Sequence, residues 1–217
     1  MIKRLLLYLV AATLLLAVAV SADQWDEDTA LLQQHAEEIS AYLDAQWADA
    51  QNWVKANDLE SLQRSNDPQT STTLSAIEAK DYTLLRLQGD SVMAWTNTKC
   101  IPPRSDLAYL TGQGGAPQML SIPLGQFVAA KAPGSPAIFV FIPVRYSLTG
   151  QPPFPAGPNI PEEIAFSTEK TDYPVLFGST PLGYLSATSP LHANWLQWMK
   201  VVFFGLFLAV LLALATQ

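Results

Sequence analysis

An apolar segment at the end of the chain is the feature that most limits what this sequence can fold into. The segment covers residues 195–217, and no charged side chain follows Lys200. Trp195 and Trp198 stand beside that lysine, where interfacial aromatic residues and a snorkelling cation are typical of membrane helices. We therefore expect a C-terminal membrane helix. A helix needs about 20 residues to cross a hydrocarbon layer of about 30 Å, and no Lys or Arg follows, so we expect the helix to be truncated here and to continue in a longer protein.

A second apolar run lies at the N-terminus, where Lys3 and Arg4 precede residues 5–20. Positive residues hold that end in the cytoplasm and send the following chain across the membrane. The small residues after the run also resemble a signal-peptide cleavage site, so a cleaved signal peptide and an uncleaved anchor both stay open. The anchor is favoured because a second membrane helix returns at the other end. We expect a membrane helix over 1–22 and a bacterial inner-membrane protein whose domain over 23–194 lies on the periplasmic or extracellular side.

The central region has the composition of one globular domain. About 170 residues remain between the apolar ends, enough for one hydrophobic core. The formal net charge is -7 and the basic residues are scattered, so no basic face is available for nucleic acid. Cys100 is the single cysteine, which excludes an internal disulfide and favours a buried, unreactive thiol over a reactive or intermolecular one. We expect no metal and no cofactor.

A helical period governs the first part of this domain. Apolar residues recur at spacings of three and four from Leu32 to Val54, which predicts a helix over 25–57 with one buried face. Acidic residues at 26–28 favour the helix start through the macrodipole. Two interpretations stay open. The helix packs on its own domain, or it also pairs with the same helix of a second protomer to form a homodimer.

The rest of the domain shows patterns of short β-strands. Two β-type runs flank a turn at 89–91, which predicts a hairpin. The run at 138–146 is the most hydrophobic and predicts a central strand, with a bulge or an edge at Pro143. Glycine and proline at 101–123 predict a loop with at most a turn of helix, and the proline-rich segment 147–161 predicts an irregular excursion that staples to the domain or docks a partner. The expected strands are 82–88, 92–96, 126–131, 138–146, 163–167, 175–178 and 184–188, with a short helix at 71–80.

No arrangement of residues in the sequence predicts catalysis. The chain has two histidines, and it contains neither a G-x-S-x-G elbow nor an H-E-x-x-H zinc motif. The glycine-rich stretch at 112–115 lacks the Lys and the Ser or Thr of a phosphate-binding loop. The sequence therefore assigns no enzymatic activity to this chain itself.

One stretch resembles a known family. Residues 89–97, GDSVMAWTN, are followed by a Pro- and Gly-rich loop and by the strand FIPVRY at 141–146. This order resembles the extracytoplasmic sensor region of membrane histidine kinases from Bacteroidota-type bacteria, over most of residues 23–200. The resemblance implies an α+β fold with a long N-terminal helix on a central antiparallel sheet, similar to PAS or Cache sensor domains, flanked by two transmembrane helices. The kinase core itself is absent from this sequence.

The resemblance also implies a function. The chain would be the sensing portion of a two-pass membrane receptor in a two-component system. This sensing portion would pass a ligand or partner signal to the cytoplasm through its C-terminal helix. The expected partners are the lipid bilayer, a small-molecule or protein ligand, and a second copy of the chain. The alternative is a membrane-anchored interaction or scaffold protein without signalling output.

Five residues are candidates for ligand binding. Trp95 lies in the second hairpin strand, where it either walls a ligand pocket or belongs to the core. Arg145 ends the most hydrophobic strand and either binds a carboxylate of a ligand or pairs with an acidic side chain at the surface. Tyr146 beside it can close a pocket. Tyr109 and Gln126 are weaker candidates, chosen because loops and strand ends carry recognition.

Overall fold

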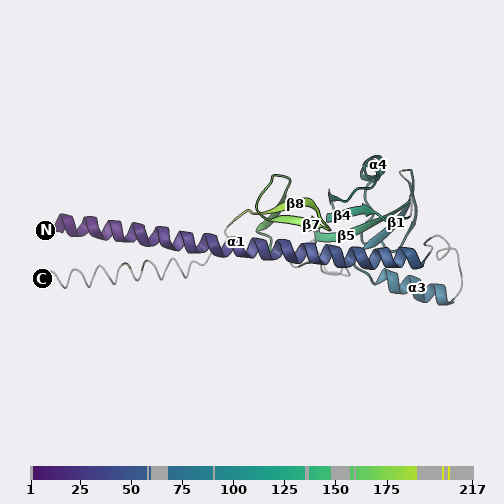
Figure 1. The fold of residues 1–217 in the computed structure, drawn as a ribbon, viewed down its shortest axis with the longest axis horizontal. Helices are drawn as coiled ribbons and strands as arrows, with labels where there is room; N and C mark the ends of the chain where they lie inside the picture. The colour runs from purple at the N-terminus through teal and green to yellow at the C-terminus, as the bar shows by residue number, and fades with distance from the viewer. Residues whose placement is uncertain are drawn as a thin grey trace. The chain divides into compact units, whose positions relative to one another are not determined.

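A computed structural model shows the chain as an α+β protein with a long helix and antiparallel β-strand pairs (Figure 1). The structure describes residues 2–57, 59, 68–89, 91–134, 137–147, 157, 158, 160–189, 202 and 205. The chain divides into two compact units. The smaller unit contains 1–34, 163–165 and 186–217, and the larger unit contains 35–162 and 166–185.

Helix α1 covers Ile2–Ala56 without a break, and both units share it. The predicted helical period holds in its second half, where Ile39 and Leu43 are buried. Asn57 closes the helix, because its backbone N–H and its side-chain amide both donate to the carbonyl oxygen of Trp53, at 3.0 and 2.9 Å. The helix expected over 25–57 is therefore the second half of a longer helix, and it ends within one residue of the expected place.

The prediction of flanking transmembrane helices is wrong for the described residues. No helix among them is both long enough and apolar enough to cross a membrane, which also corrects the predicted inner-membrane location. The apolar run at 5–20 extends about 24 Å at about 1.5 Å per residue, short of a hydrocarbon layer of about 30 Å, and α1 continues past it into a polar sequence. The predicted membrane helix over 195–217 lies outside the described residues, except for Val202 and Gly205. Its interfacial residues Trp195, Trp198 and Lys200 lie outside them too.

Five strands form an antiparallel sheet in the order β2-β1-β5-β4-β3. The hairpin predicted around the turn at 89–91 is present as β1 and β2, and Gly89 adopts a left-handed φ of 63° in that turn. The central position predicted for the strand at 138–146 is confirmed, since it is β5. The strands are β1 Thr83–Gln88, β2 Ser91–Trp95, β3 Gln118–Ile122, β4 Gly125–Lys131 and β5 Ile138–Tyr146.

The loop predicted over 101–123 is wrong in part. Helix α4, Arg104–Gly112, and strand β3 form within it. Pro103 stands at the N-cap of α4, a position at which a missing backbone N–H costs nothing. Proline disrupts the interior of a helix, but it is compatible with a helix that begins directly after it.

Pro143 introduces an irregularity into the central strand. Phe127 of β4 pairs with Pro143, whereas the preceding Gln126 pairs with Arg145, so the register shifts by one residue between the two pairs. Proline has no N–H to donate to a neighbouring strand, and a bulge removes the need for that hydrogen bond. Of the bulge and the edge that the sequence left open at Pro143, the structure shows the bulge.

The hydrophobic core lies on the face of the five-stranded sheet that α4 covers. Leu107 and Leu110 of α4 are buried in one cluster with Leu85, Phe127 and Phe141 of the strands. Figure 1 shows α1 and α4 on opposite sides of this sheet. The side chains that alternate with the core residues along the strands are buried as well: Leu84, Val128, Val140 and Ile142.

A second, three-stranded sheet has the order β6-β8-β7. The sequence predicted short strands in this region but not a separate sheet. Gly178, at a left-handed φ of 60°, forms the turn between β7 and β8, which pair antiparallel. Its strands are β6 Ile164–Ser167, β7 Pro174–Phe177 and β8 Thr180–Ala187, and helix α3 covers Pro68–Glu78 before the first sheet.

Candidate binding cleft

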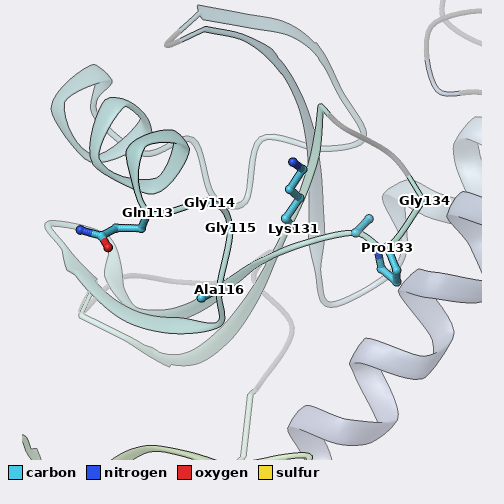
Figure 2. Close-up of a pocket in the computed structure, with 8 residues that line it drawn as sticks. Gln113, Gly114, Gly115, Ala116, Lys131, Pro133 and Gly134 are labelled. Carbon is cyan, nitrogen blue, oxygen red and sulfur yellow. The ribbon is translucent and has the colours of Figure 1, made fainter.

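Two loops of the larger unit form an open cleft of about 580 Å³ (Figure 2). One loop follows the C-terminal end of α4, and the other follows the end of β4. The volume is in the range of about 300–1,000 Å³ that small-molecule sites occupy. The cleft is lined by Gln113, Gly114, Gly115, Ala116, Lys131, Ala132, Pro133 and Gly134.

The close approach of Gly115 to Lys131 defines the shape of the cleft. The backbone N–H of Lys131 donates to the carbonyl oxygen of Gly115 at 3.0 Å, which joins the two loops. Gly115 has a left-handed φ of 82°, and a Cβ atom at this position would overlap Lys131 Cβ and lie 2.8 Å from Lys131 Cδ. The absence of a side chain at Gly115 therefore makes room for the lysine stem.

Lys131 is the ionisable side chain of the cleft lining. Figure 2 shows it rising between the turn at Gly114 and Gly115 and the loop at Pro133 and Gly134, while the side chain of Gln113 points away from it. No carboxylate of the described residues forms an ion pair with its ammonium group. The lining contains no other ionisable side chain, and a lysine ammonium group binds anions through its charge and its three N–H donors.

Three of the predicted site residues come together on the paired strands β4 and β5. Gln126 pairs with Arg145, and Gly125 pairs with Tyr146. Arg145 Nη2 donates to the carbonyl oxygen of Pro161 at 2.8 Å. Burial lowers the pKa of the Arg145 guanidinium, and the charge of Glu162 opposes that shift. The guanidinium is therefore held by the loop that follows β5.

Tyr146 belongs to the edge of the core. Its ring packs against Phe127 edge to face, with ring centroids 5.5 Å apart. Burial raises the pKa of its hydroxyl, and repulsion from the ionised forms of Cys100 and Asp81 adds to that shift, so the hydroxyl stays neutral at physiological pH. Among the described residues, no donor reaches the buried Oε1 atom of neighbouring Gln126.

The group of Gln126, Arg145 and Tyr146 does not line the cleft. Gln126 is the second residue of β4 and Lys131 is the last, which separates their backbones by about 17 Å at about 3.3 Å per residue. Trp95 and Tyr109 lie elsewhere. Trp95 is 43% exposed on the edge strand β2, and Tyr109 is 55% exposed on α4.

A polar network that the sequence did not reveal ties α1 to the start of β1. The Tyr82 hydroxyl donates to Asp49 Oδ2 at 2.8 Å, and Lys80 Nζ lies 3.0 Å from the same oxygen. Burial alone would raise the pKa of Asp49, but the hydrogen bonds from Lys80 and Tyr82 and the charge of Lys80 outweigh it and hold that pKa below its ordinary value. Asp49 precedes Lys80 and Tyr82 by 31 and 33 positions, and α3 lies between them in the sequence, so no local pattern predicts the network.

Asn97, in the stretch that carries the family resemblance, has a structural role. Its side-chain amide donates to the carbonyl oxygen of Tyr82 at 2.9 Å, and its Oδ1 accepts hydrogen bonds from the Thr83 hydroxyl and the Lys99 backbone N–H. Asn97 is 8% exposed. The side chain thus fixes the turn after β2 to the start of β1, next to the network around Tyr82.

The Cys100 thiol is buried, as the sequence predicted. Burial raises its pKa well above its usual range, so the reactive thiolate is scarce at neutral pH. We expect a disulfide reagent such as 5,5′-dithiobis(2-nitrobenzoate) to modify the native protein at least ~100-fold more slowly than the protein in urea, because modification requires opening of the core. Absorbance at neutral pH measures both rates. Equal rates would show that Cys100 is accessible in the native fold.

The described residues contain no group of three or more His, Cys, Asp or Glu side chains that could hold a metal ion. The chain matches no protein family, no curated protein and no solved structure. The features of the described residues that bear on function are the cleft and the contacts of α1.

Proposed function

We propose that this chain is the sensing portion of a signalling protein, similar in role to the sensor region of two-component histidine kinases. Its α+β unit receives a ligand, and helix α1 carries the resulting change to the rest of the protein. The observation that supports this proposal is the way the second half of α1 is bound. Polar contacts attach it to two different parts of the β-structure, and the same helix continues unbroken to Ile2.

The first attachment joins α1 to strand β7. The Ser40 hydroxyl accepts a hydrogen bond from the Leu176 N–H at 2.9 Å, and Asp44 Oδ1 accepts one from the Gly178 N–H at 2.8 Å. Trp47 packs edge to face against Phe177, with ring centroids 5.1 Å apart. Hydrogen bonds to backbone N–H groups fix the position of the helix along the strand, which apolar packing alone does not.

The second attachment joins α1 to strand β1 through Asp49, Tyr82 and Lys80. Tyr82 is fully buried and directly precedes β1, and β1 pairs with the central strand β5. The two attachments fall on either side of the buried face of α1. A shift of β1 relative to β7 therefore changes the position or rotation of the helix, and a ligand that prefers one arrangement can drive that change.

The test is hydrogen exchange in the full chain, before and after addition of a small molecule. Organic acids, amino acids, sugars and nucleosides are first screened for an increase in Tm of at least about 2 °C, which marks binding to the native state. We expect a molecule that passes this screen to change amide exchange in residues 35–56. If no molecule in the panel raises Tm, small-molecule sensing is rejected.

A matched pair of variants tests whether the helix contacts carry the response. In the double variant Ser40→Ala, Asp44→Ala, which removes both acceptors for β7, the molecule should still raise Tm while the exchange response of residues 35–56 falls by more than half. Asn52→Ala, at an exposed position of the same helix, should keep the full response. Binding that leaves α1 exchange unchanged in the wild type would refute the sensing role.

The second candidate function is that of an interaction or scaffold protein. The observation in its favour is that Met93 and Trp95, two residues apart on the edge strand β2 and so on one face of it, are 53% and 43% exposed, and neighbouring exposed apolar side chains can form part of a contact surface. The β1–β2 register shifts between Arg86 and Leu87, opposite Met93, and a bulge of this kind opposes simple addition of another strand. A response of α1 to a small molecule would favour sensing over this alternative.

A further inference from the structure

We propose that the cleft between the loops at 113–116 and 131–134 binds a small organic acid through a single carboxylate, with Lys131 as the anchoring cation. This inference deepens the proposed sensing function and rests on it for its biological purpose. Three features support this assignment: the charge of the lining, the fixed position of the lysine stem and the polarity of the helix end beside it.

The charge of the lining favours an anion. Lys131 is the ionisable residue of the lining, which contains no Asp or Glu. Its ammonium group has no ion-pair partner among the described residues, although the whole chain carries a formal net charge of -7. Because the protein as a whole is acidic, a cation without an ion-pair partner in a concave region attracts an anionic ligand more strongly than the rest of the protein surface does.

The lysine stem is held in place before any ligand arrives. The Lys131 N–H to Gly115 carbonyl hydrogen bond fixes the strand end against the turn, and the stem lies so close to Gly115 that a Cβ there would overlap it. A long, flexible side chain usually loses rotamer freedom when it binds an anion. Packing against Gly115 reduces that loss for Lys131.

The neighbouring helix end opposes anion binding, and it opposes a dianion more strongly than a monoanion. Gln113 is the C-cap of α4 and lies in the lining, so the cleft adjoins the end of a helix where the macrodipole is negative. Phosphate groups prefer helix N-termini or several cations, and this lining supplies neither. Ala116, Ala132 and Pro133 offer apolar surface for a short carbon chain. A carboxylic acid with a short apolar body fits these features.

Binding of sodium propionate to the full chain tests the site, with inorganic phosphate as the comparison and NaCl holding the ionic strength constant. Chemical-shift changes of backbone amides, followed by NMR, measure the dissociation constants. We expect saturable propionate binding with shifts at residues 113–116 and 131–134. Lys131→Gln should weaken binding by about fivefold, the upper end of the effect of losing one partly exposed charge contact, and Lys131→Arg should keep most of the affinity.

Two further variants separate the cation from its support. Gly115→Ala displaces the lysine stem and should weaken propionate binding while Lys131 keeps its charge. Lys170→Gln, at an exposed lysine outside the lining, should leave binding unchanged. Equal affinity in the wild type and in Lys131→Gln, or tighter binding of phosphate than of propionate, would overturn the assignment.

The outcomes distinguish this site from the sensing role. If propionate binding depends on Lys131 but leaves the hydrogen exchange of residues 35–56 unchanged, the carboxylate site is supported and the sensing function is rejected. A ligand response of α1 that persists in Lys131→Gln would keep sensing and reject the site.

Discussion

Gly125→Ala is expected to lower the free energy of unfolding by about 4 kcal/mol, as the sum of backbone strain and steric overlap. Gly125 begins β4 at a φ of 147°, and a Cβ there would overlap the Arg145 carbonyl oxygen and lie 2.9 Å from the Tyr146 Cα. Both atoms belong to the backbone of β5, so relief requires the paired strands to separate. Urea denaturation followed by circular dichroism measures the change.

The control for this prediction is Gly89→Ala. Gly89 also has a positive φ, of 63°, but no atom lies within 4 Å of a Cβ built there. Its substitution should cost only the backbone strain, about 1 kcal/mol. Similar losses at the two glycines would mean that the β4–β5 pair can adjust to a side chain at Gly125.

Leu43→Ala should destabilise the larger unit by about 2–5 kcal/mol, the usual cost of removing a buried leucine side chain. Leu43 is 0% exposed, and it lies on α1 between Ser40 and Trp47, which contact β7. Its loss leaves a cavity at the attachment of the helix. Urea denaturation measures the global effect, and hydrogen exchange of residues 35–56 measures the local one.

Asn52→Ala on the same helix should change stability by no more than about 0.5 kcal/mol, because Asn52 is exposed. If Leu43→Ala increased exchange only within α1 and left the sheet unaffected, the helix and the sheet would not unfold together. That result would contradict a model in which α1 responds to rearrangement of the β-structure.

Elements with strong local patterns could be predicted from the sequence. The spacing of Ile39 and Leu43 gave the helix and its buried face, and Asn57 marked its end. The turn at 89–91 predicted the first hairpin. The apolar run of β5 and its Pro143 predicted a central strand with a bulge. Each of these features depends on side-chain periodicity or on backbone chemistry within a few residues.

Elements stabilised mainly by distant contacts could not be predicted. Strand β3 is an edge strand whose residues have no strong alternation, and it forms because Gln118–Ile122 pair with β4. The second sheet brings β6 beside β8, a pairing that no local pattern specifies. The membrane prediction failed for the described residues. It rested on the apolar composition of the N-terminal run, and that run is shorter than a typical membrane-spanning helix.

The sequence by itself determined the local elements of this protein: the second half of α1, the first hairpin and the central strand, because their hydrophobic periods and turn residues act over short range. Only the tertiary structure decided the cleft. The glycine-rich stretch after α4 has no lysine of its own, and pairing of β3 with β4 brings Lys131, sixteen residues after Gly115, against it. Strand register determines that Lys131 lies against this stretch. The register depends on how the whole sheet packs rather than on the residues near the turn.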